Sequence, residues 1–369
     1  MLTAITGATG FLGSYLLSRL LEDGGEAVVL LRHDQAAGWN RIECALAGVD
    51  RPLPEDWKDR VELVRCDVTS ERLGLAPQQW QQLADRIDAV WHSAGLIGLQ
   101  DTPEALDRVN VAGTRRILEL AAASARRPRV VHVSTAFVAG ERTGGTIAED
   151  DLDDRYGFLS TYEASKCRAE QMIRHWAREN DYPVTVLRPS ILLTDRPLPP
   201  RAPRHPHAEI GARLRMLNRN PSQALPLDAA DAGVATRFPG LPGAATNLVQ
   251  VEYAADVMVH LARRTPEALV ETFHVTHPKN TSVRQIVDVM LMACPWLSLE
   301  LDPDITSFGE MERALNDVLG GIGTLPRADR LYDRSRTEYA LNGAVADPPV
   351  IDDAYLRASF GMQEPVPAA

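Results

Sequence analysis

The sequence predicts an α/β fold, a doubly wound parallel sheet with a smaller second lobe. Apolar, β-branched runs recur through the first half of the chain, and each is nearly continuous in hydrophobicity, as in strands buried on both faces. Apolar residues at helical spacing separate most of these runs. From 194 to 246 the alternation breaks into proline, glycine and arginine, which indicates an insertion.

The elements follow one another in a regular order. The first is a short strand over 2–6 that ends in GATGFLG (7–13), after which leucines at helical spacing continue until Gly24 and Gly25 stop the helix. The sequence then predicts strands at 26–32, 61–69, 88–95, 129–138 and 183–193, with helices that include 104–123 and 161–179. The alternation of strands and helices resumes after the insertion, with an apolar pattern over 247–264 and a strand over 271–277. We therefore expect a nucleotide-binding domain of 1–193 and 247–277, and a substrate-binding lobe of 194–246 and 278–369.

Composition narrows the class of protein. The formal net charge of -11 over 369 residues argues against general nucleic-acid binding, which needs a basic face. The four cysteines have neither disulfide-framework nor metal-ligand spacing, so we expect reduced thiols and no metal site. No apolar run reaches the roughly 20 residues of a membrane span. We expect a cytoplasmic enzyme, either monomeric or homodimeric.

The glycines of GATGFLG suit the phosphates of a dinucleotide. Gly7 permits a tight turn, Gly10 lets the backbone approach a pyrophosphate, and Gly13 lets the following helix pack closely on the sheet. The amino-terminus of that helix then faces the phosphates. The position of the turn, between the first strand and the first helix, favours a dinucleotide over a plain flexible turn.

The residues after the second strand predict which dinucleotide binds. NAD-binding proteins usually place an acid there, which accepts a hydrogen bond from the ribose 2′-hydroxyl. Here Arg32 and His33 occupy the position, and an arginine can bind a 2′-phosphate, so NADPH is favoured over NADH. Asp34 lies two residues later and keeps NADH as the alternative. Asp67 and Val68, after the third strand, suit an adenine amino group and its packing surface.

Tyr162 and Lys166 lie four residues apart, on one face of a predicted helix. Only three of the 39 basic residues are lysine, so this pairing is unlikely to arise by chance. An adjacent ammonium is expected to lower the pKa of the phenol and to bind ribose hydroxyls. Ser134 and Thr135 end a predicted strand, and one of the two hydroxyls would join Tyr162 in donating to a substrate oxyanion. Cys167 would point about 100° away around the helix, which argues against covalent cysteine chemistry.

Together these motifs resemble the extended short-chain dehydrogenase/reductases, which have a Rossmann fold. The likeness also includes CDV (66–68), HSAG (92–95), VNVAGT (109–114), LRPSILL (187–193), VQVEYAADV (249–257) and FHVTHPKNTSVRQIV (273–287). Matched residue by residue, it implies a catalytic triad of Thr135, Tyr162 and Lys166, with Asn110 helping to hold the lysine through water. It also implies cofactor contacts from Thr9, Phe11, Leu12, Ser93, Ala94, Gly95, Pro189, Ser190 and Ile191, of which the last three would flank the nicotinamide.

Within that superfamily the chain is most similar to the thioester reductase and fatty acyl-CoA reductase branch, through Arg32, STAFVAG (134–140), YEASKCRAEQMI (162–173) and DPPVIDDAYLRASF (347–360). The resemblance implies NADPH-dependent reduction of an acyl thioester, on CoA or an acyl carrier protein, to the aldehyde or on to the alcohol. We find no carrier domain in the sequence, and its 195–246 insertion resembles no motif that we recognise in that branch. The alternatives are a ketone or alcohol oxidoreductase for a polyketide- or steroid-like molecule, a sugar-nucleotide epimerase or dehydratase, and a non-catalytic NADP-binding protein.

The insertion opens with RPLPPRAPRHPH (196–207), a basic, proline-rich stretch in an acidic chain. Such a stretch cannot continue a helix or a central strand. It is either a disordered surface loop or a mobile lid over the substrate cleft, whose arginines would attract a phosphopantetheine thioester or an acidic carrier protein. The candidate substrate contacts are Arg201, Arg204 and Arg213.

Overall fold

A computed structural model of the chain describes residues 1–98, 101–142, 144–221, 225, 234–305, 307–319 and 329–362. Seven parallel strands form the main sheet, in the order β12-β7-β5-β4-β1-β2-β3. Their bounds are Leu2–Thr6 (β1), Glu26–Leu31 (β2), Val61–Arg65 (β3), Ala89–His92 (β4), Arg129–Val133 (β5), Val184–Pro189 (β7) and Val270–Val275 (β12). The strand order reverses between β1 and β4, which is where such folds bind their ligands. The predicted fold class is confirmed.

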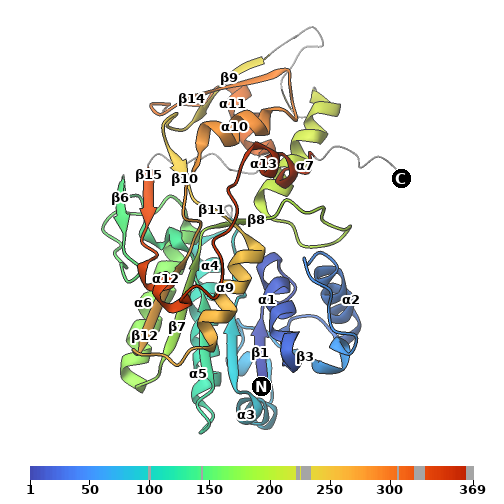
Figure 1. The fold of residues 1–369 in the computed structure, drawn as a ribbon, viewed down its shortest axis with the longest axis vertical. Helices are drawn as coiled ribbons and strands as arrows, with labels where there is room; N and C mark the ends of the chain where they lie inside the picture. The colour runs from blue at the N-terminus through green and yellow to red at the C-terminus, as the bar shows by residue number, and fades with distance from the viewer. Residues whose placement is uncertain are drawn as a thin grey trace.

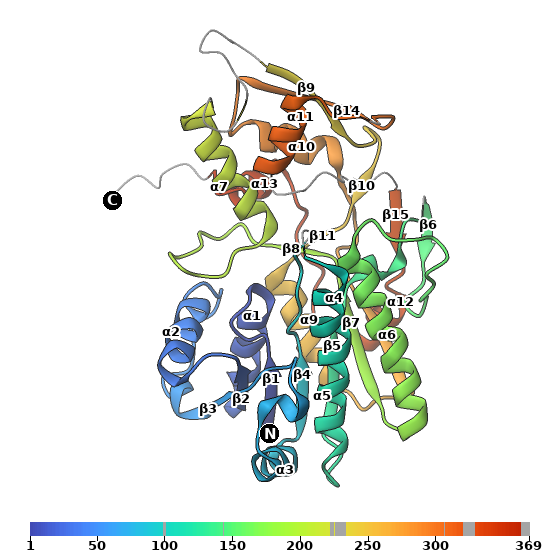
Figure 2. The same ribbon diagram turned by 180° about the vertical axis from the view of Figure 1, so that it is seen from behind.

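Helices cover both faces of this sheet, because each strand is apolar on both sides. In β1, Ile5 packs into one buried cluster and its neighbour Ala4 into another. The first cluster includes helices α1 (Phe11–Leu21), α2 (Gln35–Leu46), α9 (Val251–Arg263) and α12 (Ser335–Leu341). The second includes α3 (Pro77–Arg86), α5 (Ala112–Ala122) and α6 (Thr161–Asn180). Helices α9 and α12 lie toward the viewer in Figure 1, and α5 and α6 do so in Figure 2.

Several predicted elements end early, for local reasons. The strand expected over 129–138 stops at Val133, since Thr135 caps a short 3-10 turn over Ala136–Ala139. The strand expected over 183–193 divides into β7 and β8 (Ile191–Leu193). The helix expected over 104–123 consists of α4 (Pro103–Leu106), a π-helical turn (Asp107–Val111) and α5.

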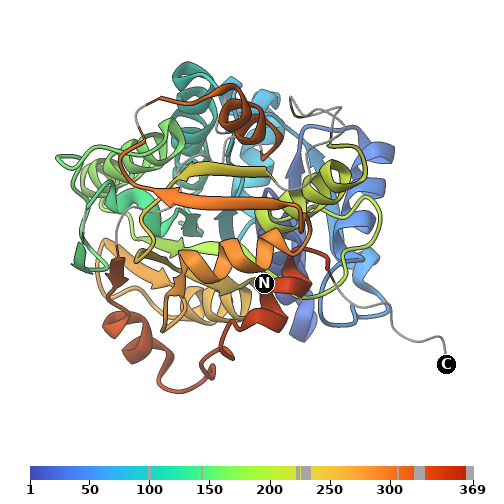
Figure 3. The ribbon, with the colours of Figure 1, turned by 90° about the horizontal axis from the view of Figure 1, so that it is seen from above.

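The remaining elements lie beyond the carboxyl ends of the main strands (Figure 1), and Figure 3 views them from above. The strands are β6 (Gly144–Ile147), β9 (Val234–Pro239), β10 (Ala245–Thr246), β11 (Leu248–Gln250), β13 (Thr281–Ser282), β14 (Leu297–Asp302) and β15 (Asp329–Tyr332). The helices are α7 (Pro206–Arg219), α10 (Val283–Leu291), α11 (Glu310–Val318) and α13 (Asp353–Ser359). A separate buried cluster, which includes Leu214, Val287 and Phe360, joins α7, α10 and the end of α13. The exact division into two domains stays a prediction.

Residues 196–205 form no helix or strand, as expected for the proline-rich stretch, but its last two residues, Pro206 and His207, begin α7. Pro206 occupies the first turn of the helix, where a missing N–H is tolerated, so the proline-rich stretch initiates α7. Residues 222–224 and 226–233 of the insertion lie outside the described residues. None of the helices in the described ranges combines the length and the apolar character needed to cross a bilayer.

Candidate active site

Two glycines of the GATGFLG motif have no room for a side chain. Gly7 has a φ of +78°, and a Cβ there would lie 2.6 Å from the backbone nitrogen of Ala94. A Cβ on Gly13 would lie 1.9 Å from the carbonyl oxygen of Gly7, so α1 packs directly on the turn. Gly10 precedes α1 without a side-chain cap, and the first turn of α1 contains no acid. The positive end of this helix is therefore available to an anion such as a pyrophosphate.

The predicted adenosine side of the site lies after β2 and β3. Arg32 and His33 follow β2 and are exposed. Asp34 caps α2 by accepting a hydrogen bond of 2.9 Å from a backbone N–H in the first helical turn. Asp67 accepts hydrogen bonds of 2.8 Å from both the backbone nitrogen and the hydroxyl of Thr69. Although burial raises the pKa of Asp67, these bonds and the charge of Arg32 lower it overall, so the two side chains lie within electrostatic range.

Lys166 reaches from α6 to the end of β5. Its Nζ donates a 2.7 Å hydrogen bond to the carbonyl oxygen of Val133 and lies 3.3 Å from Nε2 of His132. The side chain is buried, and burial lowers the pKa of the ammonium to about 8 although the charge of Glu170 opposes the shift. Two of the three N–H groups thus face β5, and in the described part of the chain the third has no hydrogen-bond acceptor.

Tyr162 is half-buried in the first turn of α6. Burial raises the pKa of its phenol, and the charge of Glu163 raises it further. The expectation that Lys166 would lower this pKa is wrong for the chain by itself, because the ammonium is held by β5. The phenol therefore stays protonated at neutral pH and can donate a hydrogen bond.

Ser134 and Thr135 have different partners, which separates their roles. Ser134 donates to the carboxylate of Glu170, and that carboxylate forms an ion pair of 2.6 Å with Arg188. Both charged side chains are at most 1% exposed. Thr135 Oγ1 accepts a 3.3 Å hydrogen bond from a backbone N–H and donates a 3.4 Å bond to the carbonyl of Pro189. The hydroxyl of Thr135 is thus the one that a substrate oxygen can engage at little cost.

Asn110 lies buried in the π-helical turn before α5. Its Nδ2 donates to the carbonyl of Leu96 (3.0 Å) and to the hydroxyl of Ser165 (2.9 Å), and its Oδ1 accepts from the nitrogen of Leu96 (2.8 Å). Asn110 therefore joins α6 to the loop after β4. Ser93, Ala94 and Gly95 belong to that loop. The predicted water bridge from Asn110 to Lys166 stays a prediction.

Pro189, Ser190 and Ile191 connect the main sheet to the second lobe. The hydroxyl of Ser190 donates a 2.7 Å bond to Oδ1 of Asn247, whose Nδ2 in turn donates to the carbonyl of His277 (2.9 Å). This chain of bonds fixes the backbone at the end of β7, beside the end of β5.

Strand β15 brings Arg330 and Tyr332 to this edge, which the sequence patterns do not predict. The guanidinium of Arg330 lies 5.9 Å from the ring centroid of Phe137, and the Tyr332 ring lies 6.5 Å from the same ring. Burial raises the pKa of Glu163, the neighbour of Tyr162, to about 7 although the charge of Arg330 opposes the shift. These residues are distant from α6 in the sequence, so no local spacing links them to Tyr162.

The proline-rich segment 196–205 packs against the nucleotide-binding side of the sheet. The His205 ring lies 5.0 Å from the ring of Phe11, the first residue of α1 after the glycine-rich turn. Pro199 and Ala202 face Gly48, where an added Cβ would lie 3.6 and 3.5 Å from them. The segment therefore reaches from the second lobe to the cofactor turn.

The three arginines proposed as substrate contacts, Arg201, Arg204 and Arg213, are all exposed. Arg201 has a φ of +70° in the turn before α7. Burial lowers the pKa of Arg215, and the charges of Arg204 and Arg219 lower it further, so these guanidinium groups lie within electrostatic range. Arg204, Arg215 and Arg219 make up what we call the α7 basic surface.

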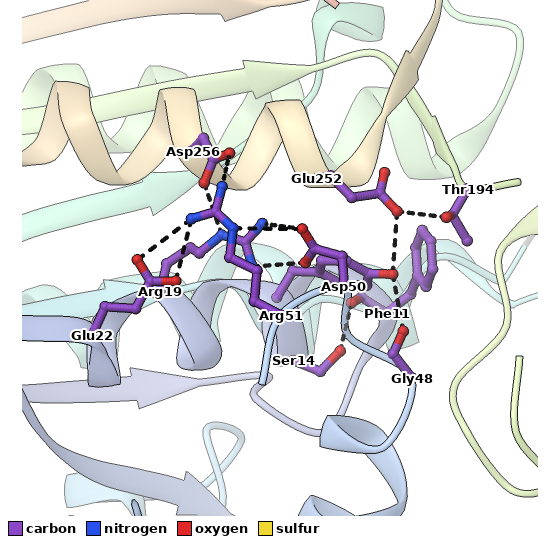
Figure 4. Close-up of polar contacts among 11 residues, drawn as sticks. Phe11, Ser14, Arg19, Glu22, Gly48, Asp50, Arg51, Thr194, Glu252 and Asp256 are labelled. Atoms are coloured by element: carbon purple, nitrogen blue, oxygen red, sulfur yellow. Dashed lines mark hydrogen bonds and ion pairs between the residues drawn. The ribbon is translucent and has the colours of Figure 1, made fainter. Parts of the chain in front are cut away.

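A polar network anchors the base of the proline-rich segment (Figure 4). The hydroxyl of Thr194 donates a 2.5 Å bond to the carboxylate of Glu252 in α9. The hydroxyl of Tyr15, in α1, lies 3.4 Å from the same carboxylate and 3.1 Å from the carbonyl oxygen of Gly48. The segment thus leaves the sheet from a point held by both α1 and α9.

The same figure shows a buried arginine between these two helices. Arg19 is 1% exposed and forms ion pairs with Asp50 (2.7 Å) and Asp256 (2.8 Å). Arg51 contacts Asp256 at 2.5 Å from the solvent side. The network joins the last turn of α1 to α9.

The environment of Cys167 does not favour a nucleophile. Its side chain is 1% exposed, and burial raises the pKa of the thiol to about 11, with the charge of Glu170 acting in the same direction. A thiol that stays protonated at neutral pH is a poor nucleophile. The expectation that Cys167 takes no part in the chemistry agrees with this environment.

Comparisons with known proteins concern both family and fold. The model of the family described as Male sterility protein, an NAD-binding domain, matches residues 5–258. The aldehyde reductase lnaA of Aspergillus flavus is 27% identical over 293 residues, which are 74% of this chain and 25% of that protein. A carboxylic acid reductase of Mycobacterium tuberculosis is 27% identical over 304 residues, 76% of this chain and 25% of that protein. The chain thus spans about a quarter of the length of these relatives.

The fold also matches that of a solved reductase domain. The terminal R domain from the myxalamid PKS-NRPS biosynthetic pathway superposes with a TM-score of 0.74 at 26% identity, covering 97% of this chain and 89% of that one. The family match covers more than half of the chain and includes the glycine-rich turn, β5 and α6. This chain belongs to the NAD-binding male sterility protein family, with the fold of the extended short-chain reductases.

Proposed function

We propose that this chain is an NADPH-dependent reductase that converts an acyl thioester into an aldehyde and a thiol. The observation that carries the proposal is the arrangement at the carboxyl end of β5. There Glu170 holds Ser134, Thr135 makes only long hydrogen bonds, and Lys166 arrives from α6. Relatives named aldehyde reductase and carboxylic acid reductase support this class of reaction.

The residues fit a dinucleotide. The turn at Gly7 admits no side chain, and the amino-terminus of α1 is uncapped, so a pyrophosphate can approach the backbone. Arg32 would bind a 2′-phosphate, and Asp67 would accept from the adenine amino group. Asp34 is already used as the cap of α2, which supports NADPH over NADH. NADPH, when bound, supplies a hydride to the carbonyl carbon of the thioester.

The side chains of the site donate hydrogen bonds and transfer the proton in this reaction. Thr135 and Tyr162 donate hydrogen bonds to the carbonyl oxygen of the thioester, where negative charge develops. The raised pKa of the phenol keeps its proton in place until the oxygen becomes basic, and the proton then passes from Tyr162 to that oxygen. Lys166 binds the ribose hydroxyls with its third N–H.

Release of the thiol completes the balance. The hemithioacetal returns its hydroxyl proton to Tyr162 as the carbon–sulfur bond breaks, and the thiolate takes a proton from water. One thioester, one NADPH and one proton thus give one aldehyde, one thiol and NADP⁺. A second cycle on the aldehyde, with the same residues, would give the alcohol.

The α7 basic surface is where the carrier of the acyl group would bind. CoA and the phosphopantetheine arm both carry phosphates, and exposed arginines attract such anions and acidic carrier proteins. The proline-rich segment joins this surface to the cofactor turn through His205 and Phe11. We therefore place the entrance for the thioester beside this segment.

The test is NADPH oxidation by the purified chain, with acyl-CoA, acyl-pantetheine and acyl-carrier thioesters against ketones of similar size. The proposal expects one trapped aldehyde and one free thiol for each NADPH, faster than with NADH, and almost none with Tyr162→Phe. Turnover of ketones without thioesters would assign the same residues to a ketone reductase. Tight NADPH binding without any substrate-dependent oxidation would contradict catalysis.

A further inference from the structure

His132 lies directly beneath the catalytic lysine, inside the main sheet. It is the fourth residue of β5, its side chain is 1% exposed, and its Nε2 is 3.3 Å from Nζ of Lys166. Neither the glycine-rich turn nor the Tyr162–Lys166 spacing predicts any role for it. An imidazole buried at the centre of a parallel sheet is unusual, because strands of this kind are mostly aliphatic.

The contact with Lys166 fixes the protonation of the ring. An ammonium can only donate hydrogen bonds, so Nε2 of His132 must accept and the ring proton must reside on Nδ1. Nδ1 is buried and has no hydrogen-bond partner among the residues that the structure describes. An unpaired buried N–H is destabilising, and an aliphatic residue at this position would avoid it. The imidazole thus costs stability, which points to a role for its other nitrogen.

The neighbouring groups cannot replace this acceptor. His92, on β4, lies 5.5 Å from His132 between ring centroids, and its two nitrogens are engaged by Thr6 (2.8 Å) and Thr114 (3.1 Å). Thr114 donates to a backbone carbonyl, so it accepts from Nε2 of His92, and burial lowers the pKa of His92 to about 3, which keeps the ring neutral. Glu170 faces Lys166 from one turn further along α6, but its oxygens are bound by Arg188 and Ser134.

We propose that His132 is a positioning residue that accepts a hydrogen bond from Lys166, keeps the ammonium charged and turns its third N–H toward the catalytic edge. The effect of His132 on turnover rests on the function proposed above, whereas the contact between His132 and Lys166 does not depend on it. Burial lowers the pKa of Lys166 to about 8, and burial also lowers the pKa of His132, so the imidazole stays a neutral acceptor across the working range. The other acceptor of the ammonium is the carbonyl of Val133.

Removing the acceptor should change the pKa of Lys166 in one direction only. The imidazole nitrogen stabilises the charged lysine more than the neutral one, so without it the pKa of Lys166 falls further. A hydrogen bond to a charged group is equivalent to about one pH unit, a tenfold change in proton affinity. His132→Phe should therefore move the loss of the ammonium, and the alkaline limb of turnover, toward neutral pH. His132→Gln keeps an acceptor at a similar reach and should restore both.

The composition of the chain makes a direct measurement possible. Lys58, Lys166 and Lys279 are the only lysines, and Lys58 and Lys279 are exposed. NMR of protein isotopically labelled at lysine Cε would show the buried ammonium as one of three signals, assigned by its loss in Lys166→Met. The titration uses the protein without cofactor or substrate, so it does not depend on the proposed reaction.

The expected result is a midpoint near pH 8 in the native chain, about one unit lower in His132→Phe and recovered in His132→Gln. His274→Gln is the matched control. His274 is a buried histidine of β12 with an unpaired Nε2 and no contact with Lys166, so this change should leave the midpoint unmoved. If His132→Phe fails to fold, as judged by thermal unfolding, His132→Leu removes the same acceptor with an aliphatic side chain.

Two outcomes separate this inference from the proposed function. A midpoint that is the same in the native chain and in His132→Phe or His132→Leu overturns the role of His132, whatever the turnover. A shifted midpoint in a chain that reduces no thioester keeps His132 as the partner of Lys166 and overturns only the proposed reaction.

Discussion

The buried ion pair behind Ser134 gives a prediction whose size follows from the geometry. Arg188 donates to Glu170 through Nη2 at 2.6 Å and through Nε at 3.0 Å, and both side chains are almost completely buried. Arg188→Met would leave a buried carboxylate with Ser134 as its remaining donor. Breaking a buried pair by removing one partner costs about 3–5 kcal/mol. The free energy of unfolding should fall by that amount at pH 7.

The stability lost in Arg188→Met should depend on pH in a defined direction. In the native chain burial raises the pKa of Glu170, but the charge and hydrogen bonds of Arg188 lower it overall. The native pair therefore stabilises the fold above the unfolded-state pKa, and its contribution is lost as the pH falls through the lower folded value. In Arg188→Met, uncompensated burial raises the pKa, so the fold gains stability when the carboxyl is protonated. The difference between the two proteins should shrink between pH 7 and about 4.5.

Urea unfolding followed by tryptophan fluorescence measures this difference. Arg86→Met is the matched control, because Arg86 forms an ion pair of the same length, 2.6 Å, with Glu62 on the surface, where both side chains are about half exposed. That pair should be worth no more than about 1 kcal/mol. Combining Glu170→Gln with Arg188→Met should cost less than Arg188→Met alone. An Arg188→Met cost equal to that of Arg86→Met, or one that does not change with pH, would refute the reasoning.

Three further predictions concern the cofactor, the chemistry and the carrier. Arg32→Ala should weaken NADPH binding by on the order of 1.5–3 kcal/mol and leave NADH binding nearly unchanged, and equal losses in fluorescence titrations would remove Arg32 from the 2′-phosphate site. Tyr162→Phe should keep NADPH affinity but lower turnover at least about a hundredfold, and normal turnover would exclude Tyr162 as the acid. Neutralising Arg201, Arg204 and Arg213 together should raise KM for the thioester and flatten its dependence on salt, with NADPH affinity unchanged. An unaltered KM across ionic strengths would instead favour an uncharged substrate.

The sequence predicts the main sheet and its glycine-rich turn well, since both depend on local patterns. Apolar runs specify buried strands, and Gly7 and Gly13 are needed where the backbone approaches Ala94 and α1 most closely. The ends of strands are less predictable. The run over 129–138 becomes apolar again at Ala136 after two hydroxyl residues, and the cap formed by Thr135 begins a 3-10 turn there instead of more strand.

The partners of the site residues are what the sequence could not provide. Ser134 and Thr135 are equivalent hydroxyls by their position, and the distinction between them depends on Glu170, which comes from α6. The spacing of Tyr162 and Lys166 places both on one helix face, but it cannot show that β5 holds the ammonium and that burial dominates the pKa of the phenol. Such effects depend on desolvation, which is a property of the assembled fold.

The contact between α1 and α9 has a consequence for synthesis of the chain. Arg19 and Asp256 are 237 residues apart, and the leucines of α1 share their buried cluster with α9. At about 5–20 residues per second, roughly 10 to 50 s pass before the ribosome adds the helix that covers this face. During that time the first βα unit exposes apolar side chains and an arginine without its partner Asp256. Nascent chains that stop before residue 251 should therefore aggregate or recruit chaperones, whereas chains extended past α9 should become resistant to protease.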